Sequence, residues 1–184
     1  MEPITNAKNL ALYWVQPKAS QRYFLLLSDE REFASLEFQS AFGSLAVAIT
    51  TERQWSFKRV GFFNPRVTVR RLNEEIDLAV YHPRWTGSEG TLSMAGGRSF
   101  TWKATNFWAT CYTFLDSAGE QLLWFKEGAP ESRFSNLFKI QAKVDIEAAG
   151  WQLPDLELLL ALGWYLLILR HEDAAAGAAA AAAV

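Results

Sequence analysis

The 184-residue chain has very little cysteine and histidine, and each shortage excludes a class of site. Cys111 is the sole cysteine, so neither an intrachain disulfide nor a cysteine-based zinc site can form. The two histidines, His82 and His171, lie far apart in the sequence and have no neighbouring acidic pattern that would indicate a metal site. A Ser-His-Asp triad could use His82 and Asp77, but no nucleophile-elbow motif accompanies them. We therefore expect no enzymatic activity and no cofactor.

The chain also lacks an apolar run long enough for a transmembrane helix. A span needs about 20 apolar residues, whereas Leu156 to Leu169 supplies about 14, or about 21 Å of helix. Residues 170–173 (Arg-His-Glu-Asp) separate this run from the alanines that follow, and charges are costly in lipid. A C-terminal membrane anchor is therefore the less favoured alternative. Residues 1–6 do not resemble a secretory signal, which predicts a cytoplasmic location.

The formal net charge is -2, so the chain as a whole has no excess of positive charge that would attract a polyanion. Three aromatic stretches, Phe62-Phe63, Phe107-Trp108 and Trp124-Phe125, could stack on nucleic-acid bases. The acidic balance and the lack of an RNA-binding signature favour packing in the core or barrel wall instead. We expect no nucleic-acid partner.

What the sequence does contain is a series of short apolar segments separated by turn residues, which is typical of antiparallel strands. Phe138 to Ile146 alternates apolar with polar residues and predicts a half-buried strand. Two hairpins are expected, one around residues 116–120 and one around residues 95–98. Further strands are predicted at residues 23–27, 33–38, 45–51, 55–63, 67–71 and 78–81.

The pattern changes after Gly150 to that of one strong helix. Pro154 and Asp155 suit a helix start, and an unbroken apolar run from Leu158 to Leu169 follows, which predicts a helix over about residues 155–170. A helix that is apolar on every face must be surrounded by protein if it is not in lipid. Strands that close into a barrel around it would do so. Residues 174–184, nearly all alanine, are expected to be a frayed helical extension or a disordered tail.

The segment from Trp151 to Leu167 resembles the end of phospholipid scramblases, where a proline and an acidic pair lead into an apolar helix. With the strand pattern before it, the chain resembles the tubby C-terminal-like superfamily, which includes scramblases, LURP-one-related proteins and tubby proteins. The resemblance covers most of the chain and implies a mainly β fold. Its form would be a closed antiparallel barrel of about 12 strands around a hydrophobic helix, in one domain over residues 1–173.

Tubby proteins bind phosphoinositides through Lys and Arg, so the resemblance directs attention to basic residues. The densest basic cluster surrounds the stretch Gly61-Phe62-Phe63, and we predict a site for an anionic lipid there, formed by Lys58, Arg59, Arg66, Arg70 and Arg71. Strand alternation allows a second interpretation, in which these side chains form a solvated outer face.

Scramblase-like proteins also carry an acidic calcium-binding segment near the C-terminal helix. Asp145, Glu147, Asp155 and Glu157 lie in that region, but they are sparser than the scramblase pattern and too few for the six to eight oxygens that calcium requires. We interpret them as helix-start and solvated strand residues and expect no metal site.

Two functional hypotheses follow. The first is a non-enzymatic, tubby-like domain that binds a phospholipid headgroup or the surface of an anionic membrane, peripherally and from the cytoplasm. The second is a protein-interaction or scaffold domain without a lipid ligand. The oligomeric state is left open.

Overall fold

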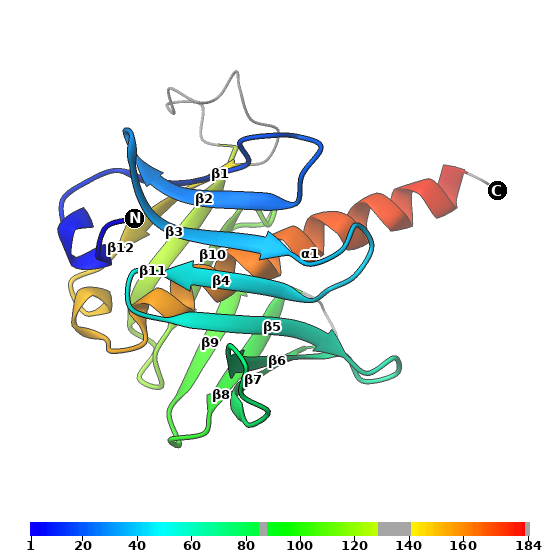
Figure 1. The fold of residues 1–184 in the computed structure, drawn as a ribbon. Coiled ribbons are helices and arrows are strands. Elements are labelled where there is room, and N and C mark those ends of the chain that lie inside the picture. Colours follow the sequence, from blue (N-terminus) through cyan, green and yellow to red (C-terminus); the bar gives the residue numbers. More distant parts are fainter. Residues whose placement is uncertain (85–87, 129–140, 183–184) are drawn as a thin grey trace.

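The computed structural model describes residues 1–84, 88–128 and 141–182. Twelve antiparallel strands close into a barrel, in agreement with the fold class expected from the sequence (Figure 1). The strands are β1 (Leu12–Val15), β2 (Tyr23–Ser28), β3 (Arg31–Phe38), β4 (Ala46–Thr50), β5 (Gln54–Val60), β6 (Arg66–Arg71), β7 (Asp77–Pro83), β8 (Glu89–Met94), β9 (Ser99–Ala104), β10 (Cys111–Leu115), β11 (Gln121–Glu127) and β12 (Gln141–Ile146).

Every strand pairs with its neighbours in sequence, and β1 closes the barrel by pairing with β12, where Leu12 lies opposite Val144. Among the described strands, closure leaves none with an unpaired edge. The predicted alternation holds in β12, where Ala142 and Val144 are buried. The earlier part of that predicted strand, Phe138 to Ile140, lies outside the described residues.

One predicted strand is shorter than expected. The segment 55–63 leaves the extended conformation after Val60, because Gly61 has a φ of 86°. A Cβ at that position would lie 2.5 Å from the carbonyl oxygen of Asn64, so the turn requires glycine. In the opposite direction, β7 extends past Tyr81 to Pro83, which lies opposite Gly90.

The predicted C-terminal helix is present as α1 (Leu156–Ala182), which runs through the barrel and continues beyond it (Figure 1). Two short 3-10 turns, η1 (Ile4–Ala7) and η2 (Gly150–Gln152), precede β1 and α1. Between Leu156 and Leu169 every residue of α1 except Glu157 is buried. Residues 174–182 are helical and exposed, so the alanine segment is a helical extension as far as the structure describes it. Within the described residues, no helix is both long enough and apolar enough to span a membrane.

Aromatic side chains join α1 to strands around the barrel. The indole of Trp164 stacks on that of Trp14 in β1, with ring centroids 5.8 Å apart. The ring of Tyr165 stacks on Phe38 in β3, with centroids 5.5 Å apart. On another side of the helix, a Cβ at Gly163 would lie 2.5 Å from the ring of Phe125 in β11. The helix therefore fills the barrel interior, which leaves the two ends and the outer wall for function.

Candidate functional site

Polar contacts at each terminus of α1 distinguish the two ends of the barrel. At the helix-entry end, Arg53 donates a hydrogen bond to the carbonyl of Pro154, and Arg98 pairs with Asp155. The loops at this end are residues 1–11, 29–30, 51–53, 72–76, 95–98, 116–120 and 147–155. At the helix-exit end, Arg59 binds Asp173. Its described loop residues are 16–22, 39–45, 61–65, 84, 88, 105–110 and 128.

Charge is distributed unequally between the two ends. The loops of the helix-entry end contain ten of the 20 acidic residues of the chain, namely Glu2, Asp29, Glu30, Glu52, Glu74, Glu75, Asp116, Glu120, Glu147 and Asp155. The described loop residues of the helix-exit end contain no acidic residue. Basic residues of the described loops are equally numerous at the two ends, with Lys18, Arg22 and Arg84 at the helix-exit end and Lys8, Arg53 and Arg98 at the helix-entry end. The protein is therefore electrostatically polarised along the barrel axis although its net charge is small.

Acidic residues on the strands and helix near the helix-exit end are mostly ion-paired. Glu89 pairs with Arg84, and Glu127 contacts both Arg170 and His171. Glu37, on the outer face of β3, is exposed and has no ion pair with a described residue. Pairing neutralises most of the negative charge that lies beside the acid-free loops.

The helix-exit end also exposes large aromatic side chains. Phe42 is fully exposed, the exposed fractions of Phe62, Phe63 and Phe107 are 91%, 97% and 91%, and that of Trp108 is 77%. The expectation that Phe62-Phe63 and Phe107-Trp108 pack in the core or wall is therefore wrong, because both pairs lie in loops rather than on inward-facing strand positions. In the third stretch, Trp124-Phe125, the expectation holds for Phe125, which is buried in the core.

Local structure holds these aromatic loops in defined conformations. In residues 105–110, the Asn106 side-chain oxygen accepts hydrogen bonds from the backbone N–H groups of Thr110 and Cys111, and Ala109 has a φ of 50°. A non-glycine residue in that region of φ is uncommon and requires support from its surroundings. The aromatic pairs are thus presented by ordered turns.

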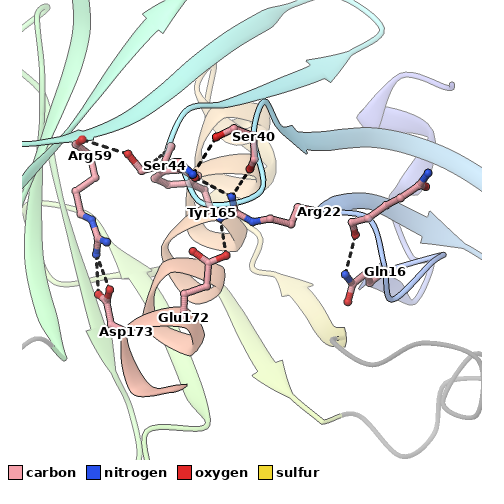
Figure 2. Close-up of polar contacts among 10 residues, drawn as sticks. Gln16, Arg22, Ser40, Ser44, Arg59, Tyr165, Glu172 and Asp173 are labelled. Carbon is pink, nitrogen blue, oxygen red and sulfur yellow. Dashed lines mark hydrogen bonds and ion pairs between the residues drawn. The ribbon is translucent and has the colours of Figure 1, made fainter. Parts of the chain in front are cut away.

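Arg22 organises the third aromatic loop, residues 39–45 (Figure 2). Its guanidinium donates hydrogen bonds of 2.7 Å to the carbonyls of Ser40 and Gly43 and also binds Glu172 of α1. The same group lies 3.8 Å from the ring centroid of Phe38. Arg22 therefore connects the loop that carries Phe42 to the part of α1 that leaves the barrel.

Two further contacts hold α1 at this end (Figure 2). The Tyr165 hydroxyl donates a 2.6 Å hydrogen bond to the carbonyl of Ser44, and the Arg59 guanidinium binds both carboxylate oxygens of Asp173 at 2.7 and 2.8 Å. Burial raises the pKa of Tyr165 above its ordinary value, so the hydroxyl keeps its proton and remains a donor at physiological pH.

The structure does not gather the five predicted lipid-binding cations into one patch. Arg59 lies on the inward-facing side of β5, and its guanidinium forms an ion pair with Asp173. Arg71, opposite the buried Trp55, lies at the helix-entry end, where its guanidinium is 3.8 Å from Glu74. The two are thus at opposite ends of the barrel.

The other three predicted cations follow the outer face of the wall. Arg70 pairs with Asp77 at 2.6 Å, toward the helix-entry end. Lys58 lies opposite Thr68, and Arg66 precedes Thr68 by two residues, so Lys58 and Arg66 are diagonal neighbours in the half of the wall near the helix-exit end. Both are exposed and neither has an ion pair with a described residue.

The four acids considered for calcium make separate contacts. Asp145 pairs with Lys143 and Asp155 with Arg98, while Glu147 lies 3.4 Å from the side-chain amide of Gln121. Among the described residues there is no group of three or more His, Cys, Asp or Glu side chains that could hold a metal ion.

Glu157, the fourth of these acids, accepts a 2.8 Å hydrogen bond from the Thr50 hydroxyl. Burial raises its pKa, which this hydrogen bond partly offsets. Its carboxylate is therefore part of the contact between the start of α1 and β4.

A cleft of about 330 Å³ opens at the helix-entry end, where Arg53, Arg71 and Arg98 line it together with Asp155. The other titratable residues considered from sequence lie elsewhere. His82 is exposed on β7, Asp77 is occupied by Arg70, and Cys111 is half-buried at the start of β10.

Comparison with known proteins gave no match to a protein-family model, to a curated protein or to a solved structure. The geometry and charges of the chain itself therefore carry the functional conclusion.

Proposed function

We propose that this protein is a non-enzymatic, tubby-like domain that binds the surface of anionic phospholipid membranes through its helix-exit end. The observation that carries the proposal is the charge polarity of the barrel, with acid-free described loops at one end and ten acidic loop residues at the other. An anionic surface attracts the first end and repels the second, so binding and orientation have the same electrostatic cause.

The cations of the outer wall add to this attraction. Lys58 and Arg66 are exposed, lie in the half of the wall near the helix-exit end, and make no ion pair within the described part of the chain. Of the five basic residues predicted from sequence, the proposal gives these two the largest role. Arg59, Arg70 and Arg71 have acidic partners that already offset their charge.

The resemblance of the Trp151–Leu167 segment to the end of scramblases also favours a phospholipid ligand. No protein-family model matches the chain, so the resemblance is weaker support than the charges. A scaffold role would instead require a protein partner whose surface charge is complementary to this polarity.

Vesicle flotation tests the proposal. We expect the wild-type protein to float with vesicles that contain phosphatidylserine but not with pure phosphatidylcholine vesicles at low protein concentration, and we expect binding to weaken as salt rises. Each basic side chain near an anionic surface contributes about 1 kcal/mol, so Lys58→Gln with Arg66→Gln should weaken binding roughly 30-fold.

Arg70→Gln with Arg71→Gln is the matched control, because it removes the same charge from the same strand pair farther from the proposed surface. Along the strand, Arg70 and Arg71 lie about 13–17 Å from Arg66 and about 7–10 Å from the level of Lys58. Each of them also already pairs with an acidic side chain. We expect the control to change binding less than threefold. Absence of flotation by the wild type at low salt would favour the scaffold hypothesis.

A further inference from the structure

Several aromatic side chains at the helix-exit end are exposed. Electrostatic attraction to a membrane does not by itself require exposed aromatic side chains. Phe42, Phe62, Phe63, Phe107 and Trp108 are all more than three-quarters exposed. Single exposed apolar residues are common on protein surfaces, whereas a set confined to one end is typical of an interaction site. At the helix-entry end, Ile76 is the described large apolar residue with comparable exposure.

Their arrangement suits a broad surface rather than a small ligand. Phe42 lies between β3 and β4, the next loop around the rim carries Phe62 and Phe63, and Phe107 with Trp108 lies between β9 and β10. Figure 1 shows the β3–β4 and β5–β6 loops on the side where α1 leaves the barrel. Aromatic side chains from separate parts of one rim can contact a plane simultaneously.

Each loop is held in place before any partner arrives. The Phe62–Phe63 turn depends on Gly61, the Phe107–Trp108 loop on Asn106, and the loop that carries Phe42 on Arg22. The ring centroids within the two aromatic pairs are 5.1 and 5.2 Å apart. Because these loops are already ordered, less conformational entropy is lost when their aromatic side chains insert into an apolar environment.

The charges around the aromatic residues favour lipid over a protein partner. The loops that carry these residues, 39–45, 61–65 and 105–110, have no charged side chain. The neighbouring Arg22, in residues 16–22, faces α1 and the carbonyls of residues 40 and 43. Residues 174–182, which protrude about 13 Å on this side, are also uncharged. Cations on the wall, Lys58 and Arg66, are set back from the loop tips at a level suited to lipid phosphates.

We infer that the five aromatic side chains insert into the boundary between headgroups and acyl chains, so that the partner is an intact phospholipid bilayer rather than a free headgroup. This inference rests on the proposed binding of anionic membranes and specifies its contact surface. Trp108 and the phenylalanines supply the apolar contact, while the wall cations remain at the headgroups.

Depth-dependent fluorescence quenching tests the insertion. Trp108 lies at the proposed contact, so vesicles of phosphatidylserine and phosphatidylcholine with bromine at shallow acyl positions should quench part of the tryptophan emission. The Trp108→Phe variant, which keeps an aromatic ring, should bind these vesicles but lose that part of the quenching.

Binding by aromatic variants is the second measurement. The two double variants replace Phe62 and Phe63 with Ser, or Phe107 and Trp108 with Ser. Each should weaken vesicle binding at least about tenfold, because full burial of even one such side chain strengthens binding by about that factor. This loss should persist at high salt wherever binding is measurable. Ile76→Ser, a similarly exposed residue at the other end, is the matched control and should have no effect. Soluble glycerophosphoserine should not compete with vesicles.

The outcomes distinguish this inference from the function on which it rests. Salt-sensitive vesicle binding without quenching, with full binding by both aromatic double variants, would overturn the insertion and leave the charge-based function intact. Failure of the wild type to bind anionic vesicles would overturn both. Dimers that disappear in the aromatic variants, without vesicle binding, would assign the aromatic residues to a second copy of the chain. Loss of binding only when residues 174–184 are removed would assign the contact to the alanine segment.

Discussion

At the residue scale, Gly163 shows how tightly the helix and barrel fit together. Its position in the middle of α1 is unfavourable for helix propensity, since alanine is better there by about 1 kcal/mol. A Cβ at this position would lie 2.5 Å from Phe125 and 3.2 Å from Phe114. Glycine is therefore present because two strand aromatics occupy the space that a side chain would need.

We predict that Gly163→Ala lowers the free energy of unfolding by about 1–3 kcal/mol despite the gain in helix propensity, because the added methyl group overpacks the core. Urea denaturation monitored by circular dichroism would measure it. Gly177→Ala is the control on the same helix, where an added Cβ meets nothing within 4 Å, and it should not destabilise. Equal stability of Gly163→Ala and wild type would mean that the helix packs less closely against β10 and β11.

At the element scale, the start of α1 contains a half-buried acid, Glu157, whose ionisation opposes folding. Burial raises the pKa of Glu157 in the native state, while the hydrogen bond from Thr50 lowers it. Because the native state holds this proton more tightly than the unfolded chain, the free energy of unfolding falls as pH rises from about 4.3 through the raised native pKa. This destabilising contribution of Glu157 is absent at low pH, because the carboxyl is then protonated in both the native and the unfolded state.

We predict that Glu157→Gln removes this part of the pH dependence. The variant and wild type should have similar stability near pH 3.5, and the variant should become the more stable of the two as pH rises toward neutrality. Chemical denaturation at a series of pH values would measure the difference. Thr50→Val should steepen the wild-type pH dependence, since it removes the hydrogen bond that stabilises the carboxylate. A difference between Glu157→Gln and wild type that does not vary with pH would contradict this account.

The two polar contacts at the other end of α1 have a different role. Arg22 and Arg59 bind Glu172 and Asp173, and these contacts fix where the helix leaves the barrel. The ion pair of Arg59 is half-exposed, so its contribution to stability is small. Its consequence is geometric, because it places the uncharged segment that follows on the same side as the aromatic loops.

For the molecule as a whole, stability and the proposed binding depend on different parts of the chain. The core is formed by the inward faces of the strands and by α1 up to Leu169. The exposed helical residues 174–182 contribute almost no buried surface. The loops of the helix-exit end likewise expose their aromatic side chains rather than bury them.

We therefore predict that truncation after Asp173 changes the free energy of unfolding by less than about 1 kcal/mol, an amount that end effects on the helix dipole can account for. Thermal denaturation of the full-length and truncated proteins would show similar Tm values. A large loss of stability would indicate that the alanine segment packs against the rest of the protein in solution.

The sequence by itself determined most of the fold, because the strand alternation and the continuous apolar helix are local patterns with a physical period. A helix apolar on every face must be enclosed if it is not in lipid, and together with the strand pattern this favoured a barrel. The number of about 12 strands came from the resemblance to the tubby-like superfamily. The site was less predictable. Proximity in sequence grouped Lys58, Arg59, Arg66, Arg70 and Arg71, but the tertiary structure distributes them over both ends and the outer wall. The aromatic stretches Phe62-Phe63 and Phe107-Trp108 were expected to pack in the core or barrel wall, because composition does not show which residues fall between strands. The scarcity of acidic residues at alternate connections was a signal in the sequence, since five of these six connections have none and the sixth, between β11 and β12, has Glu131. Only closure of the barrel, which brings every second connection to the same end, decided that these turns share one surface.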